Sequence, residues 1–225
     1  MKQEVLKFSF KFISNEFYVT EKNTFAYKII KDWPNWSNQI VFIYGPKKCG
    51  KTMISKIWQE MSSAKYLSHK NFDNLVPDSF DLNFVKKNNW IIDDVDKLLS
   101  KHKGKNKEKV LNLINIIKTN PNSYLLMTSL TPPNMINCGL QDLTSRILAS
   151  IVVEVGYPDQ ELLSKIIRKY LADRNVELSE KCILFISNRI ERSYESAFKI
   201  AKKIDTQSLE NKSSISVHFL KTLFS

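Results

Sequence analysis

The chain has 225 residues and a formal net charge of +11, with 43% hydrophobic and 25% charged residues. This composition is typical of globular proteins, and no run approaches the roughly 18–20 apolar residues that cross a bilayer, so we expect no membrane segment. Residues 1–12 lack the apolar core of a signal peptide, and Cys49, Cys138 and Cys182 have no metal or redox spacing, which predicts a cytoplasmic protein.

The first two thirds of the chain predict an α/β fold. A helix capped by Thr20 has an apolar face and ends at Pro34. Five short apolar strands then alternate with helical segments: Ile40–Tyr44, Lys65–Ser68, Trp90–Asp93, Ser123–Thr128 and Ile151–Val155. This alternation predicts a parallel five-stranded sheet between helices, with the ligand at the carboxyl ends of its strands.

The pattern changes after Gly156, because the apolar residues that follow have helical spacing only. We therefore expect three regions: an extended tail over residues 1–14, an α/β domain over 15–156 and a small all-helical domain over 157–225.

A phosphate-binding loop with the pattern G-x-x-x-x-G-K-[ST] follows the first strand. We predict that the eight residues of this motif and the residue after it, Met53, bind a nucleotide. They are Gly45, Pro46, Lys47, Lys48, Cys49, Gly50, Lys51, Thr52 and Met53. In such a loop the backbone N–H groups face a polyphosphate, Lys51 reaches the β and γ oxygens, and Thr52 is offered to Mg²⁺. The alternative is a chance match, but the flanking strand and helix favour a nucleotide site.

Two carboxylates end the strand that lies about 40 residues further along. In nucleoside triphosphatases the first, here Asp93, holds Mg²⁺ through water, and the second, Asp94, orients or deprotonates the attacking water. Asp94 alone could instead cap a helix. Together with the loop, the pair predicts binding of ATP or ADP with Mg²⁺ through Thr52 and Asp93.

These residues resemble the AAA+ family, specifically its DnaA-like branch. Phe17-Tyr18-Val19 with Asn23 resembles the box that contacts adenine, which implies that Val19 and Asn23 contact the base. Leu125–Ser129 is similar to the sensor strand and implies a role for Thr128. Leu143-Thr144-Ser145-Arg146 is similar to the arginine-finger box. The resemblance implies an AAA+ P-loop core followed by a helical lid.

Within this branch the length favours a paralogue of the Hda type, because we expect no helix-turn-helix domain after the lid. Gln3, Leu6 and Phe8 resemble the peptide that docks on the DNA polymerase sliding clamp; alternatively, this tail packs on the core. The resemblance implies an activator of DnaA-bound ATP hydrolysis, with DnaA and the clamp as partners, DNA reached through the clamp, and self-association open.

Arg146 would act in trans, beside the γ-phosphate held by a neighbouring subunit; the alternative is a structural salt bridge. Two departures from the branch predict a weak ATPase in the chain's own site: Glu195 stands where the lid has an arginine, and Leu130 replaces an acidic residue. Two other functions stay open, a helicase-loader-like ATPase that binds DNA through an exposed loop at Lys101–Lys107 and a non-catalytic, nucleotide-locked adaptor on the clamp.

Overall fold

The computed structural model describes residues 17–68, 71–72, 85, 88–100, 104–136, 138–211 and 215–224. The predicted tail with Gln3, Leu6 and Phe8 lies outside these residues, so its docking role stays a prediction. None of the helices in the described ranges is long and apolar enough to cross a membrane.

Five parallel strands form one sheet: β1 (Ile40–Tyr44), β2 (Lys65–Ser68), β3 (Trp90–Asp93), β4 (Leu125–Ser129) and β5 (Ile151–Glu154). Their spatial order is β2-β3-β4-β1-β5. The parallel sheet is therefore confirmed. The predicted strand Ser123–Thr128 was placed too early, because the N–H of Ser123 donates to the carbonyl of Asn120 in a turn.

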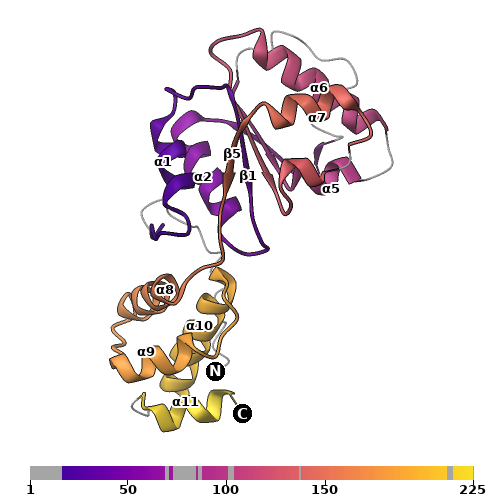
Figure 1. Ribbon diagram of the computed structural model, residues 1–225. Helices are drawn as coiled ribbons and strands as arrows, with labels where there is room; N and C mark the ends of the chain where they lie inside the picture. The colour runs from indigo at the N-terminus through magenta and orange to yellow at the C-terminus, as the bar shows by residue number, and fades with distance from the viewer. Residues whose placement is uncertain are drawn as a thin grey trace, which may run out of the picture.

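Helices cover both faces of the sheet (Figure 1). On one face lie α1 (Thr24–Asp32) and α2 (Lys51–Ser62); on the other lie α5 (Val95–Ser100), α6 (Gly104–Lys118) and α7 (Gln141–Leu148), with the short helix η2 (Pro133–Met135) before α7. An apolar core lies on each face of the sheet, and alternate residues of β1 pack into one or the other. Ile40 and Phe42 pack with α5, α6 and α7, whereas Val41 and Ile43 pack with α1 and α2.

Two local expectations were wrong. Thr20 does not cap α1, which begins at Thr24, because Thr20 and Asn23 form a turn in which the Thr20 N–H donates to Asn23 Oδ1 at 2.8 Å. The expected exposed loop at Lys101–Lys107 is helical from Gly104 onward, since those residues form the start of α6.

The expected helical region follows β5 and forms a second lobe (Figure 1). It consists of α8 (Gln160–Ala172), α9 (Glu180–Ser187), α10 (Tyr194–Asn211) and α11 (Val217–Phe224), packed around their own apolar core. Asp159 and Ser179 cap α8 and α9 through their side chains, which fixes where these helices begin. Phe17, Tyr18 and Met53 also pack against this core, so segments from the sheet lobe contact the helical lobe.

Candidate functional site

The loop between β1 and α2 requires glycine at its two fixed positions. A Cβ on Gly45 would lie 2.1 Å from the backbone oxygen of Val155. Gly50 has φ +106°, and a Cβ there would lie 2.9 Å from the ring of Tyr194. Both positions therefore exclude any side chain, one through backbone contact and the other through backbone conformation and the closeness of α10.

Lys51 folds back across this loop. Its Nζ donates to the carbonyl oxygens of Gly45 and Pro46, both at 2.7 Å, and lies 3.8 Å from the sulfur of Cys49. The side chain is buried. The ammonium group thus lies inside the loop, surrounded by neutral acceptors that phosphate oxygens could replace.

The end of the phosphate-binding loop lies next to Asp93, which is the last residue of β3. Thr52 Oγ1 lies 3.2 Å and 3.4 Å from the two carboxylate oxygens of Asp93. The hydroxyl groups of Tyr66 and Thr128 also donate to Asp93, one to each oxygen. The predicted metal ligands Thr52 and Asp93 are therefore neighbours, and carboxylate and hydroxyl oxygens suit Mg²⁺.

Tyr66 was missed by the sequence analysis, because it enters the site only through the pairing of β2 with β3. Burial, followed by the hydrogen bond to Asp93, raises the pKa of its phenol well above the ordinary value. The phenol is therefore neutral near pH 7 and can serve as a hydrogen-bond donor.

Asp94 lies beside Asp93 but has a different environment. Its carboxylate forms an ion pair with Lys97, and its backbone N–H donates to Thr128 Oγ1 at 3.0 Å. Its carbonyl accepts the first hydrogen bonds of α5, so Asp94 directly precedes that helix. It also lines a cleft between the phosphate-binding loop, α2 and α10. The role of Asp94 toward the attacking water stays a prediction.

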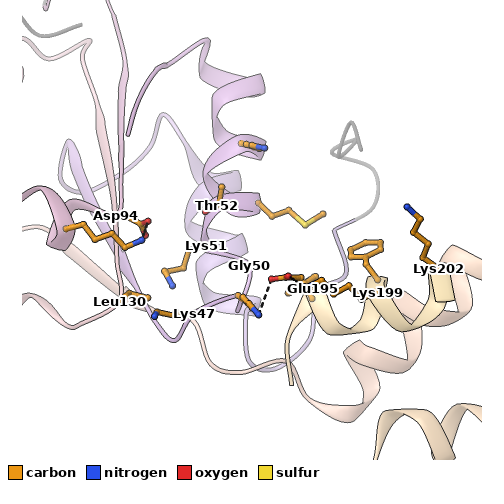
Figure 2. A pocket seen from close by; sticks show the side chains of 15 residues that line it. Lys47, Gly50, Lys51, Thr52, Asp94, Leu130, Glu195, Lys199 and Lys202 are labelled. Carbon is orange, nitrogen blue, oxygen red and sulfur yellow. Dashed lines mark hydrogen bonds and ion pairs between the residues drawn. The ribbon is translucent and has the colours of Figure 1, made fainter. Parts of the chain in front are cut away.

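A cleft of about 550 Å³ lies between the loop, α2 and α10 (Figure 2). Leu130 and Met53 contribute to its lining. Lysines dominate the polar groups around it: Lys47, Lys48 and Lys51 from the loop and its end, and Lys56, Lys97, Lys199 and Lys202 from the helices. Such a concentration of positive charge favours a polyanionic ligand.

Glu195 faces this cleft, as expected for the lid, but its charge is compensated. It forms ion pairs with Lys199 and, at 3.1 Å, with Lys48 of the loop. The hydrogen bonds from Lys199 and Lys48 lower the pKa of Glu195. Figure 2 shows Glu195 close to Gly50, with Lys199 and Lys202 further along α10. These two lysines were not among the predicted site residues, although spacings of four and seven residues place them on the same face of α10 as Glu195.

The predicted adenine residues lie at the junction of the lobes. Val19 is partly exposed, whereas Asn23 is buried. The amide nitrogen of Asn23 donates to the Tyr18 carbonyl at 2.9 Å and to the Tyr194 hydroxyl at 3.3 Å. Burial raises the pKa of Tyr194, so its phenol is neutral as it packs against Gly50. Asn23 thus links the N-terminal segment to the lid, and direct contact of Val19 and Asn23 with adenine stays a prediction.

Arg146 lies on α7, in the helical layer on the other side of the sheet from α2. Its side chain is exposed and does not line the phosphate cleft. Among the residues that the structure describes, Arg146 has no ion-pair partner, so the structural salt bridge considered above is not observed.

Comparisons with known proteins relate both sequence and fold to DnaA. No family model matches. The chain is 31% identical over 197 residues to the chromosomal replication initiator protein DnaA of Campylobacter jejuni, which covers 80% of this chain but 44% of the relative. It therefore spans less than half the length of that curated relative.

Two solved structures share the fold. A replication initiator DnaA bound to AMPPCP and single-stranded DNA has a TM-score of 0.75 and 23% identity, covering 90% of this chain and 68% of that one. Domain III of the Thermotoga maritima DnaA also has a TM-score of 0.75, at 20% identity, covering 91% and 92%. The sheet, the helical lid and these similarities agree with the expected AAA+ architecture. By sequence and by fold, the chain is a DnaA-like AAA+ protein.

Proposed function

We propose that this chain is an Hda-like regulator of replication initiation. It binds an adenine nucleotide with Mg²⁺, docks on the sliding clamp through its N-terminal tail, and promotes hydrolysis of DnaA-bound ATP by inserting Arg146 in trans. The position of Arg146 carries the proposal: an exposed arginine, away from the phosphate cleft of its own chain, is available to the cleft of a neighbour.

Nucleotide binding is supported by the geometry of the loop. Phosphate oxygens would take the place of the carbonyl oxygens around Lys51 Nζ, and the lysines of the cleft would balance their charge. Thr52 and Asp93 would hold Mg²⁺, which when bound would neutralise charge on the β and γ oxygens. The solved DnaA structure that contains AMPPCP has the same fold, which supports ATP or ADP as the ligand.

Action on DnaA is supported by the similarity of this chain to DnaA and by the positive charge of Arg146. A core that shares sequence and fold with DnaA offers the surfaces through which such domains could pair. The guanidinium of Arg146 would then lie beside the γ-phosphate held by DnaA and stabilise the negative charge that develops during hydrolysis. In other arginine-finger systems this effect amounts to about 10³–10⁵ in rate.

The test measures hydrolysis of DnaA-bound ATP in the presence of DNA-loaded clamp. Wild type should accelerate hydrolysis, and Arg146→Ala should lose nearly all of the acceleration. Arg189→Ala, which removes an exposed arginine two residues after the lid helix α9, should behave like wild type. Acceleration that survives in Arg146→Ala would refute the finger; no acceleration by wild type would refute the regulator and favour the adaptor.

The tail is tested in the same assay. Replacing Gln3, Leu6 and Phe8 together with alanine should abolish clamp binding and clamp-dependent acceleration, because the apolar anchors and the amide are lost. Replacing the interspersed Lys2, Glu4 and Lys7 provides the matched control and should retain both. If the first variant still binds the clamp, docking occurs through another surface.

A further inference from the structure

Tyr66 is placed to control the orientation of the Asp93 carboxylate. We propose that Tyr66 is a positioning residue for the Mg²⁺ site: its hydroxyl, together with that of Thr128, holds the carboxylate so that its remaining acceptor sites face Thr52. The inference rests on the nucleotide and Mg²⁺ site proposed above and deepens it by adding a residue from outside the loop and the acidic strand.

The sheet register explains how Tyr66 reaches this position. Within the parallel β2-β3 pair, Tyr66 lies opposite Ile91, two residues before Asp93, so the side chains of Tyr66 and Asp93 belong to the same face of the sheet. The Tyr66 ring packs with the apolar core between the sheet and α2. Its hydroxyl then extends to Asp93 Oδ2 at 2.5 Å.

Three hydroxyl groups surround the Asp93 carboxylate: those of Thr52, Tyr66 and Thr128. A carboxylate has about four acceptor sites, two on each oxygen. Tyr66 uses one site on Oδ2, and Thr128 uses one on Oδ1. Thr52 Oγ1 lies 3.4 Å from Oδ1 and 3.2 Å from Oδ2. The carboxylate is thus oriented toward the hydroxyl with which it would share a cation.

The donors also preserve the charge of Asp93. Tyr66 and Thr128 are neutral, so they orient the carboxylate without cancelling its negative charge, whereas Asp94 is paired with the ammonium group of Lys97. A cation gains more from an uncompensated carboxylate than from one that already has a positive partner. This contrast assigns the metal to Asp93 and makes the Tyr66 hydroxyl part of its support.

Loss of the hydroxyl should therefore change the response to Mg²⁺ more than the binding of nucleotide itself. Tyr66→Phe keeps the ring that packs on the core and removes the hydroxyl, with its hydrogen bond to Asp93 and its interaction with Ser55. Removal of such supporting groups around bound metals costs about 10–100-fold in metal affinity in other proteins. We expect the Mg²⁺ concentration that gives half of the maximal Mg²⁺-dependent gain in ADP affinity to rise about tenfold.

The experiment measures ADP affinity by fluorescence titration in EDTA and over a series of Mg²⁺ concentrations, with Mn²⁺ binding followed independently by electron paramagnetic resonance. Tyr66→Phe should match wild type in EDTA but need about tenfold more Mg²⁺ and bind Mn²⁺ correspondingly more weakly. Tyr124→Phe is the matched control, since that hydroxyl donates to the Pro34 carbonyl outside the site. It should behave as wild type in every titration.

Thr128→Val removes the second donor and should shift the Mg²⁺ response in the same direction, so the proposal remains testable if Tyr66→Phe does not fold. A Tyr66→Phe protein that is folded by circular dichroism and has the wild-type Mg²⁺ response would overturn the assignment while leaving nucleotide binding intact. Failure of wild type to bind ADP at all would refute the proposed function itself, and the role of Tyr66 with it.

Discussion

Lys51 places an ammonium group where water scarcely reaches, since its side chain is buried. Within the described part of the chain, the hydrogen bonds of its Nζ go to neutral acceptors of the loop. Withdrawing a charge from water is costly unless an opposite charge compensates it. The loop therefore holds a cation whose environment improves when an anion enters. This is the residue on which nucleotide binding depends most directly.

Lys51→Ala should weaken ADP binding roughly 100-fold or more, because two hydrogen bonds to a charged group contribute about 3 kcal/mol or more in total. The measurement is isothermal titration of ADP in the presence of Mg²⁺. Lys181→Ala, an exposed lysine on α9, is the control and should bind as wild type does. Unchanged affinity in a folded Lys51→Ala protein would remove the loop from the nucleotide site.

At the scale of elements, α10 contacts the phosphate loop through three kinds of interaction. The Tyr194 N–H donates to the Lys48 carbonyl at 3.3 Å, and the Tyr194 ring lies against Gly50. Glu195 forms an ion pair with Lys48 at 3.1 Å, and Glu191, three residues before α10, adds a second at 3.6 Å. The side chains of these ion pairs are exposed to water, which screens their attraction. The charge contact between lid and loop is therefore weak enough to rearrange when phosphates enter.

Glu195→Gln should bind nucleotide several-fold more tightly, because it removes a negative charge from the cleft and leaves Lys48 and Lys199 available for phosphate. The pKa of Glu195 is lowered by those lysines, so its carboxylate stays charged at neutral pH, and the ion pairs would be lost only as the pH falls through that lowered value. The difference between variant and wild type should therefore be constant from about pH 6 to pH 8.

Glu180→Gln, which breaks an exposed pair with Arg168 elsewhere on the lid, should leave affinity unchanged. Weaker binding by Glu195→Gln would mean that the ion pairs hold the lid in its binding position, and that Glu195 assists the ligand.

The helices, strands and motifs could be predicted from the sequence more fully than the contacts between side chains of different elements. Apolar periodicity located the five strands and the helices of the lid, and the loop pattern with Asp93 identified groups that the fold brings together. Tyr66 and Lys199 could not be identified in this way, because their place in the site depends on the β2-β3 register and on which face of α10 meets the loop. The prediction that α1 is capped by Thr20 was wrong because the backbone N–H of Thr20 donates to the side-chain oxygen of Asn23. This hydrogen bond favours a turn before the helix.

At the scale of the whole molecule, the cleft is lined by residues of both lobes, while Arg146 lies apart from it. Helix α2 belongs to the sheet lobe and α10 to the helical lobe, so a ligand between them would contact both (Figures 1 and 2). Arg146 lies on α7, whose apolar residues pack on the opposite side of the sheet from α2. One chain thus presents its phosphate cleft and its exposed arginine in different places, which suits action between neighbouring subunits.

This separation predicts a slow ATPase for the isolated chain. Arg146 does not line the cleft of its own chain. Leu130 provides no charge there, and Glu195 forms ion pairs with Lys48 and Lys199. Steady-state turnover at submicromolar concentration should be below about 1 per second, under the ordinary enzyme range, and Arg146→Ala should leave it unchanged. A faster turnover, or one that Arg146→Ala abolishes where sedimentation shows monomers only, would place the finger in its own chain's site and contradict action in trans.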